Sequence, residues 1–263
     1  MSLAGFTAVV TGSTRGIGRE MALAFARAGC RVVVHGQDAA RAEETRAACG
    51  DGALSFLCDL AHPQAASDLM DFAAAQTGRL DILVNNAGVV KMESFLEFRH
   101  ETWRELLDIH LSGAFYCGQA AARHMVRQGS GRIINISTIA AGFGQFGFAA
   151  YSPVKAGVEA LTRVMAVELA AHGISVNCIA PGPVWNEMME HLYGPERLAE
   201  RQRTIPMRRM ALASEFAAAA LYLCSPEAGY MTGQVLHLDG GASAAGPFTM
   251  EVYRRSSGSS GPA

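Results

Sequence analysis

Tyr151 and Lys155 are the residues of this chain with the clearest chemical potential, and they stand four positions apart in Tyr151-Ser-Pro-Val-Lys155. On a helix, two residues at this spacing lie on one face, one turn apart. A free phenol has a pKa of about 10 and exchanges protons poorly at neutral pH. A cation held within about 4–6 Å favours the phenolate and lowers that pKa. The pair therefore predicts a proton-transferring tyrosine, although the same spacing also arises by chance and needs support from its context.

A glycine-rich turn supplies part of that context. The segment Thr11-Gly12-Ser13-Thr14-Arg15-Gly16-Ile17-Gly18 follows the first apolar run. Glycines permit positive φ and let backbone N–H groups approach a pyrophosphate, and a following helix directs partial positive charge at the anion. The alternative is an ordinary turn without a ligand. Its position directly after the first predicted strand favours phosphate binding.

Short apolar runs alternate with longer helical stretches along the rest of the chain. The predicted strands are Thr7–Thr11, Arg31–His35, Leu54–Cys58, Ile82–Asn85, Arg132–Ser137, Ser175–Ile179 and Gln234–Leu238. The predicted helices are Ile17–Ala28, Asp38–Cys49, Pro63–Thr77, Glu101–Gln128, Val154–His172 and Ser214–Cys224. This alternation predicts a single-domain Rossmann-type α/β fold, a doubly wound parallel sheet of about seven strands with helices on both faces.

The predicted domain organisation has one folded unit and one tail. Residues 1–243 form the nucleotide-binding and catalytic domain, within which 183–210, rich in Pro and Gly at its start, suggests a lid over the substrate. Residues 244–263 follow the last strand and end in a Ser/Gly-rich run, for which we expect flexibility.

Composition narrows the class of function. The chain has 263 residues, of which 50% are hydrophobic and 17% charged, with a net charge of −2. This balance supports a large core and argues against a nucleic-acid or membrane partner. The six cysteines have no Cys-x-x-Cys spacing, the histidines show no metal-ligand spacing, and the start lacks a signal-peptide pattern. We therefore expect a cytoplasmic protein without a bound metal.

Three further motifs follow in order: Asn85-Asn86-Ala87-Gly88 after the fourth strand, Pro181-Gly182 after the sixth, and Leu236–Gly241 at the end. Together with the glycine turn and the Tyr–Lys pair, they resemble the classical short-chain dehydrogenase/reductase family, and in particular its 3-oxoacyl-carrier-protein reductase-like members. The resemblance runs from about residue 5 to residue 241. It implies an oxidoreductase that exchanges a hydride between a nicotinamide cofactor and a secondary alcohol or ketone.

The resemblance also assigns catalytic roles. Tyr151 is the general acid–base, and Lys155 lowers its pKa and binds the nicotinamide ribose. The family serine corresponds to Thr138, which keeps the hydroxyl and adds a methyl group; Ser137 is the alternative. The fourth catalytic residue of the family, an asparagine, is replaced by His110, which either supports a proton relay or only packs.

The cofactor is assigned to residues in five segments. They are Gly12, Thr14, Arg15, Gly16, Ile17, Gly18, Asp59, Leu60, Asn86, Ala87, Gly88, Tyr151, Lys155, Pro181, Gly182, Val184 and Asn186. Asp59 is also interpretable as a helix N-cap before Pro63.

NADP(H) is favoured over NAD(H) by two positions. Gly36 stands where NAD-preferring relatives carry aspartate, and Arg15 matches a position where NADP-preferring relatives often carry a cation. Against this, Gln37 replaces a second arginine, and Asp38 is near enough in sequence to reach the ribose.

Three functions stay open at this point. A small soluble alcohol or ketone is favoured as the substrate over a 3-oxoacyl thioester, whose acidic carrier protein needs a basic dock for which Arg123, Arg127 and Arg132 are the candidates. A nucleotide-binding regulatory protein without catalysis is the third. The resemblance further implies a homotetramer, or a dimer, built through helices such as Glu101–Gln128 and Val154–His172.

Overall fold

The computed structural model describes residues 2–185, 196 and 198–245. Seven parallel strands form one sheet in the order β3-β2-β1-β4-β5-β6-β7. The strands are β1 (Thr7–Val10), β2 (Arg31–Gly36), β3 (Leu54–Leu57), β4 (Ile82–Asn85), β5 (Gly131–Ile136), β6 (Ile174–Pro181) and β7 (Val235–Leu238). The predicted fold class is therefore confirmed, and each strand begins and ends within two residues of its predicted bounds.

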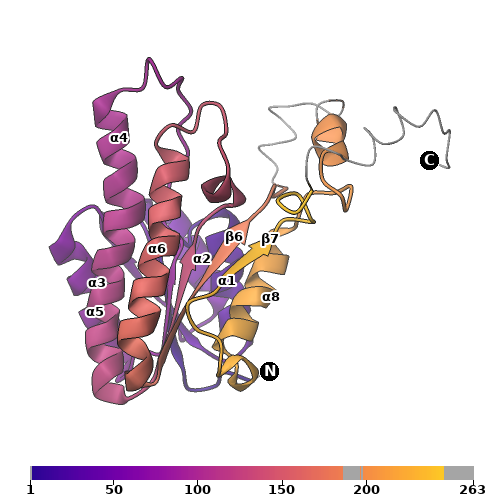
Figure 1. Cartoon of the computed structure of the whole chain (residues 1–263). Coiled ribbons are helices and arrows are strands. Elements are labelled where there is room, and N and C mark those ends of the chain that lie inside the picture. Colours follow the sequence, from indigo (N-terminus) through magenta and orange to yellow (C-terminus); the bar gives the residue numbers. More distant parts are fainter. Residues whose placement is uncertain (1, 186–195, 197, 246–263) are drawn as a thin grey trace, which may run out of the picture.

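Helices cover both faces of this sheet (Figure 1). They are α1 (Gly16–Arg27), α2 (Ala39–Cys49), α3 (Pro63–Thr77), α4 (His100–Leu106), α5 (Gly113–Gln128), α6 (Tyr151–Leu169) and α8 (Ala213–Cys224). Shorter turns are η1 (Leu107–Ser112), η2 (Ile139–Gly142), η3 (Ala170–His172) and η4 (Pro226–Ala228). Helices α3, α5 and α6 lie on one face, and α1 and α8 lie on the other (Figure 1).

Alternate residues of the strands supply two separate cores. Val10 of β1 packs with Phe25 of α1 and Phe216 of α8 on one face. Val9, its neighbour in the strand, packs on the other face with residues such as Leu69 of α3. Successive strand residues point to opposite sides, so a strand buried on both faces must be apolar throughout. This is why the apolar runs located the strands.

The order β3-β2-β1-β4 places the reversal of strand order between β1 and β4. Ligands of doubly wound sheets bind at such a switch point, beyond the carboxyl ends of the strands. The segments that follow β1, β4, β5 and β6 all emerge at this edge. They carry the glycine turn, the Asn-Ala-Gly segment, Thr138 and Pro181-Gly182.

Two helix predictions need correction. The predicted helix Glu101–Gln128 is divided by η1, a π-helical turn that contains His110. Helix α6 begins at Tyr151, three residues earlier than predicted, because Pro153 is accepted in the first turn of a helix, where no N–H partner is needed.

The structure describes part of the predicted lid and only the first two residues of the predicted tail. Residues 186–195 and 197 of the lid, and 246–263 of the tail, are not among the described residues. At the edges of the lid, Val184 forms a parallel bridge with Ala211. No helix among the residues described is long and apolar enough to cross a bilayer.

Candidate active site

The glycine turn is held by a histidine from the neighbouring strand. The backbone N–H of Gly12 donates to Nδ1 of His35 (3.1 Å), and Nε2 of His35 contacts the carbonyl of Cys58 (3.2 Å). Burial lowers the pKa of His35 to about 4, so the ring is neutral and Nδ1 accepts. Sequence reasoning missed this residue, because a histidine at a strand end has no distinguishing pattern.

Close packing explains the glycine at position 12. Its φ is +62°, and a Cβ there would lie 2.7 Å from Cα of Ala87. The side chain of Thr11 joins the same two segments, since its Oγ1 accepts from the backbone N–H groups of Asn86 (2.9 Å) and Ala87 (3.0 Å). The Asn-Ala-Gly segment is therefore fixed against the turn.

The start of α1 fits a phosphate. Its N-cap residue, Arg15, makes no side-chain cap, and no acidic residue stands in the first turn. Gly16 has φ +56°, and a Cβ there would meet no atom within 4 Å. Open space beside uncapped N–H groups at the positive end of a 12-residue helix suits the pyrophosphate of a dinucleotide.

Tyr151 and Lys155 stand one turn apart at the start of α6, as predicted. Nζ of Lys155 donates to the carbonyl of Ile136 (2.7 Å) and lies 5.9 Å from the centroid of the Tyr151 ring. Burial lowers the pKa of Lys155 to about 8. Burial also raises the pKa of Tyr151 to about 12, so the predicted lowering by Lys155 is wrong for this structure. Desolvation of the phenolate outweighs an amine that is directed at a carbonyl.

Two aromatic rings orient the phenol of Tyr151. The imidazole of His110 meets it at 5.4 Å between centroids and 82°, and the phenyl ring of Phe148 meets it at 5.2 Å and 71°. Such edge-to-face pairs are favourable and restrict the ring's rotation. The tyrosine hydroxyl is thus aimed by packing on both sides.

The structure separates the roles of Ser137 and Thr138. Ser137 is buried, and its Oγ donates to Glu159 (2.8 Å), which ties β5 to α6. Oγ1 of Thr138 accepts from the backbone N–H of Ala140 (3.3 Å), and so its own hydrogen stays available to a substrate oxygen. This arrangement favours Thr138 as the hydroxyl donor.

His110 is buried and tightly enclosed. Its Nε2 lies 2.8 Å from the carbonyl oxygen and 3.3 Å from the backbone nitrogen of Val89, and the tautomer decides which of the two it bonds, whereas Nδ1 has no hydrogen-bond partner among the described residues. A Cβ at Gly88 would lie 2.6 Å from Nδ1, so only glycine fits beside the ring. Burial, and then the charge of Lys155, lower the pKa of His110 to about 3. The imidazole is therefore neutral at physiological pH.

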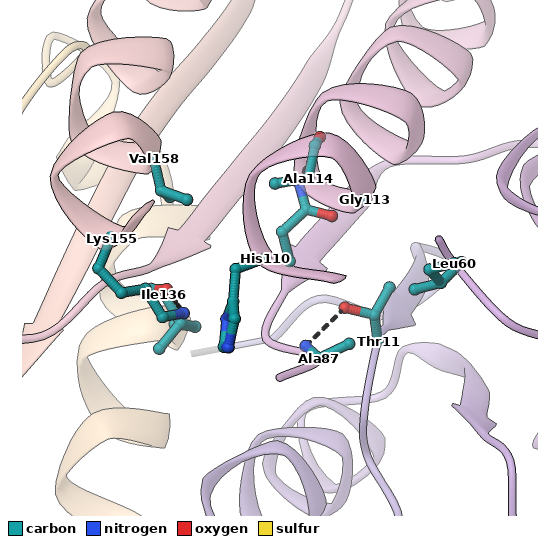
Figure 2. Close-up of a pocket in the computed structure, with 10 residues that line it drawn as sticks. Thr11, Leu60, Ala87, His110, Gly113, Ala114, Ile136, Lys155 and Val158 are labelled. Atoms are coloured by element: carbon teal, nitrogen blue, oxygen red, sulfur yellow. Dashed lines mark hydrogen bonds between the residues drawn. The ribbon is translucent and has the colours of Figure 1, made fainter. Parts of the chain in front are cut away.

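His110 and Lys155 also line a small inner cavity of about 10 Å³, enough for about one water molecule. In Figure 2 the imidazole lies between Lys155 on one side and the Thr11–Ala87 hydrogen bond on the other. The predicted cofactor residues Leu60 and Ala87 line this inner cavity as well.

A larger cavity of about 220 Å³, here called the catalytic cavity, brings most of the predicted residues together. Three of its residues, Val89, Val90 and Ile136, were not predicted, and Ser137 was predicted only as the alternative to Thr138. The predicted residues that line it are Ile17, Asn86, Gly88, His110, Thr138, Tyr151, Lys155, Pro181, Gly182 and Val184.

Six of the described cofactor residues that were predicted line neither of these cavities: Gly12, Thr14, Arg15, Gly16 and Gly18 of the glycine turn, and Asp59. Asp59 is exposed, and its carboxylate accepts from the backbone N–H of Ala61 (3.0 Å). The N-cap of α3 is His62, so the alternative interpretation of Asp59 as that cap is wrong. Asn186 lies outside the described residues.

The end of β2 has features that bear on cofactor choice. Gly36 packs against the side chain of Thr14, and a Cβ at Gly36 would overlap the Thr14 methyl group. Asp38 caps α2 by accepting from the N–H of Arg41 (3.1 Å), and it pairs with the Arg41 guanidinium (3.5 Å). Arg15 is exposed, and its guanidinium makes no hydrogen bond or ion pair with a described residue.

A buried chain of polar side chains connects the sheet to the catalytic helix. Nδ2 of Asn85 donates to Oδ1 of Asn135 (2.9 Å), whose Nδ2 donates to Oγ1 of Thr162 (2.8 Å) on α6. The hydroxyl of Thr162 donates in turn to the carbonyl of Val158 (2.8 Å). Each member is satisfied, as buried polar groups must be. Sequence reasoning did not find this chain, because its members come from three separate elements.

Comparison with known proteins identifies the family. A family model described as enoyl-(acyl carrier protein) reductase matches residues 12–243. The chain is 38% identical to the 3-oxoacyl-(acyl-carrier-protein) reductase of Synechocystis sp., over 89% of this chain and 95% of that protein. It is also 38% identical to the 2-dehydro-3-deoxy-D-gluconate 5-dehydrogenase of Escherichia coli, over 91% of this chain and 96% of the relative. The chain belongs to the short-chain dehydrogenase/reductase family.

Solved structures agree with this assignment. The gluconate 5-dehydrogenase of Burkholderia cenocepacia in complex with NADP and tartrate matches with a TM-score of 0.87 and 32% identity, over 93% of this chain and 98% of that one. The acetoin dehydrogenase of Enterobacter cloacae matches with a TM-score of 0.85 and 34% identity, over 94% and 99% of the two chains. As a member of this family, the chain is an oxidoreductase that transfers a hydride between a nicotinamide cofactor and an alcohol or ketone group.

Proposed function

We propose that the protein interconverts a secondary alcohol and a ketone with NADP(H). The observation that carries the proposal is the shared position of Thr138, Tyr151 and Lys155 on one cavity. That cavity is bounded on its other side by Ile17 of the glycine turn and by Pro181. A carbonyl group and a nicotinamide ring can therefore meet beside a hydroxyl donor and a proton donor.

The residues that would hold the cofactor are those of the glycine turn for the pyrophosphate, Asn86–Gly88 beside it, and Lys155 with Pro181–Val184 toward the nicotinamide end. When bound, the cofactor supplies or accepts the hydride. The protein's task is then to orient the carbonyl and to move one proton.

In the reduction direction, the hydroxyl of Thr138 donates a hydrogen bond to the substrate oxygen and polarises the carbonyl. Tyr151 then gives its proton to the oxygen as negative charge develops there. A pKa of about 12 keeps the phenol protonated at physiological pH, which is the form an acid needs. The Lys155 ammonium stabilises the phenolate that results.

We propose that His110 is a positioning residue of this proton path. His110 lines the inner cavity that Lys155 also lines, and its neutral Nδ1 has no partner among the described residues. A water molecule in that cavity would accept from Lys155 and donate to Nδ1. The His110→Ala variant tests this. If protons are supplied through the water, the variant should show a smaller solvent isotope effect than the wild type. Its pH–rate profile should also differ from that of the wild type near the pKa of Lys155, about 8. An unchanged profile would limit His110 to packing.

The preference for NADP(H) rests on the environment of the adenosine ribose. Gly36 presents no carboxylate, Asp38 is occupied as a helix cap, and Arg15 is exposed and able to meet a 2′-phosphate. The expected result is a higher kcat/KM with NADPH than with NADH, and Arg15→Ala should reduce this ratio by about tenfold. A preference for NADH would contradict the proposal.

A 3-oxoacyl thioester is the second candidate substrate, favoured by the name of the Synechocystis relative. The basic dock predicted for it is not assembled at the site. Arg132 is the second residue of β5, at the edge of the sheet opposite the active site, and Arg123 bonds Gln119 on the outer face of α5 (3.1 Å). Turnover of acetoacetyl-coenzyme A well above that of simple ketones would favour the thioester.

We further propose a homotetramer or dimer in the cytoplasm. The outer face of α5 and α6 has exposed Phe115, Val164 and Val167, and a cavity of about 410 Å³ that also includes Arg123 and Glu168. Apolar residues with charges of both signs suit a self-complementary contact between two copies. The six free cysteines suit a reducing compartment.

The decisive experiment for the proposed function replaces Tyr151 by phenylalanine. Phenylalanine keeps the edge-to-face packing and loses only the hydroxyl. Ketone-dependent oxidation of NADPH should fall by at least about 10³-fold, whereas NADPH binding, measured by fluorescence titration, should persist. A wild-type protein that binds the nucleotide and turns over no alcohol or ketone would support the regulatory alternative instead.

A further inference from the structure

Another cavity, about 440 Å³ in volume, is lined by residues next to the catalytic tyrosine in the chain, such as Ser152 and Pro153. We call it the aromatic pocket, and it is defined by Phe95, Phe143, Phe146, Phe148, Ser152 and Pro153, with small residues between them. Phe148 belongs to this pocket and also packs against Tyr151 of the catalytic cavity. One phenyl ring thus lines the aromatic pocket and contacts a residue of the catalytic cavity.

Several of the apolar side chains at the aromatic pocket are largely exposed to solvent. Phe146 is 87% exposed and Phe95 is 81% exposed, and the adjacent Leu96 is 95% exposed. Isolated exposed apolar residues need no explanation, but a contiguous aromatic surface around a cavity marks a binding site.

The same two chain segments contribute residues to both cavities. The segment after β4 contributes Val90 to the catalytic cavity and Phe95 to the aromatic pocket. The segment after β5 contributes Thr138 to the first and Phe143 to the second. A backbone hydrogen bond from Glu93 to the carbonyl of Gly147 (3.1 Å) joins these two segments into one wall.

No ionisable side chain lines the aromatic pocket among the described residues, and its polar side chains are those of Gln145 and Ser152. The cations of the nearby loop are neutralised, since Lys91 pairs with Glu105 and Arg99 pairs with Glu93 (3.2 Å). Of the described residues around the catalytic cavity, only Lys155 has a cationic side chain. Among the described residues that line the two cavities, a substrate carboxylate would therefore find no cation other than Lys155.

We propose, resting on the ketone–alcohol chemistry above, that the aromatic pocket is a substrate subsite for an uncharged alkyl or aryl substituent. The reacting carbonyl meets Thr138 and Tyr151 in the catalytic cavity, and the apolar substituent extends past Phe148 onto the other phenyl rings of the pocket. The enzyme then selects apolar ketones and alcohols and rejects hydroxy acids and sugar acids. A second copy of the chain is the competing occupant, but the exposed apolar face of α5 and α6 already provides a separate surface for that purpose.

The test measures kcat/KM with NADPH for straight-chain methyl ketones from butan-2-one to nonan-2-one, and for 8-oxononanoate, the carboxylate analogue of the longest ketone. Burial of each methylene should raise kcat/KM by about three- to fourfold. The carboxylate analogue should be at least about 10²-fold poorer than nonan-2-one, because the pocket would bury a charge without a partner.

Two variants locate the effect. The double variant Phe95→Ser/Phe146→Ser should reduce the gain to less than about twofold per methylene. Both side chains are highly exposed, so the fold should tolerate the change. Tyr230→Ser is the matched control, since Tyr230 is fully exposed on the loop after η4 and should leave the gradient unchanged.

The outcomes separate the two proposals. Turnover of ketones without a chain-length gradient, or an equal rate with 8-oxononanoate, would overturn the subsite and leave the proposed function standing. A gradient that survives in the double variant while the sedimentation velocity shows a changed oligomeric state would assign the pocket to a contact between copies. Failure of the wild type to turn over any ketone would overturn the proposed function itself, and the subsite with it.

Discussion

Replacing Gly88 by alanine should disrupt the packing of the active site through a single neighbouring ring. The three atoms nearest to a Cβ at this position all belong to the imidazole of His110, and Nδ1 would lie 2.6 Å away. Cε1 of the ring would lie closer still, and ordinary contacts of a Cβ begin at 3.4 Å, so the ring must move by more than 1 Å. The backbone of Gly88 does not adopt positive φ, so alanine brings no conformational strain of its own.

The cost can be approximated from two contributions. Overfilling a packed site costs about 1–3 kcal/mol. Movement of the ring also weakens the hydrogen bond between Nε2 of His110 and Val89, which contributes about 1 kcal/mol. A total of about 2–4 kcal/mol should lower the Tm of a domain of this size by about 4–16 °C.

The assay is a double-mutant cycle with Gly88→Ala, His110→Ala and the double variant, followed by urea unfolding and thermal melting. In the His110→Ala background the added methyl group meets no ring, so Gly88→Ala should cost less than about 0.5 kcal/mol there. The coupling energy between the two positions should therefore be about 2 kcal/mol. An equal cost of Gly88→Ala in both backgrounds would refute the reasoning, since the clash would then not involve His110.

Three further predictions concern Lys155, Asp81 and Val167. Because burial lowers the pKa of Lys155 to about 8, its charge is present at lower pH and lost as pH rises through 8, so kcat for ketone reduction should fall about tenfold per pH unit above that pKa. The pKa of Lys155 is 10.5 in the unfolded chain, so the folded state loses this proton at a lower pH than the unfolded state. The free energy of unfolding of the wild type, relative to that of Lys155→Met, should therefore rise between about pH 8 and 10.5. A difference in urea midpoints that does not change with pH would contradict the shift. Asp81→Ala should cost about 2–3 kcal/mol in urea unfolding, because the buried carboxylate accepts from the N–H of Thr7 (2.8 Å) and from Nε of Arg79 (2.7 Å), whereas Arg79→Ala, at a half-exposed side chain, should cost less. Val167→Asp, at a side chain that is 82% exposed, should reduce the sedimenting mass and leave the circular dichroism spectrum intact; an unchanged mass would place the contact between copies elsewhere.

The fold was largely predictable from the sequence because strands buried on both faces must be apolar throughout. Runs such as Val32–Val34 have no polar face, and turns separate them from helical stretches. The π-helical turn at Leu107–Ser112 was not predictable, since one inserted residue leaves the helical pattern nearly unchanged. This turn nevertheless belongs to the site, because it contains His110.

The site was predictable to the extent that its residues belong to short motifs. The motifs singled out Thr138, Tyr151 and Lys155, and in the structure all three line one cavity. The electrostatics were not predictable, because the pKa of Tyr151 depends on how deeply its ring is buried and on where the amine of Lys155 points. Contacts between distant segments, such as that of His35 with Gly12, also leave no local pattern.

The hydrogen-bonded chain from Asn85 through Asn135 to Thr162 has a consequence for how this enzyme could diversify. It anchors the helix that bears the reactive pair to the middle of the sheet, without using any atom from the surface segments that hold Phe95 or Phe143. Those segments can therefore accept insertions and new side chains while the proton-transfer machinery keeps its register. Changes of substrate range should accordingly accumulate in the two loops, and an amide lost from the anchor should be tolerated far less often.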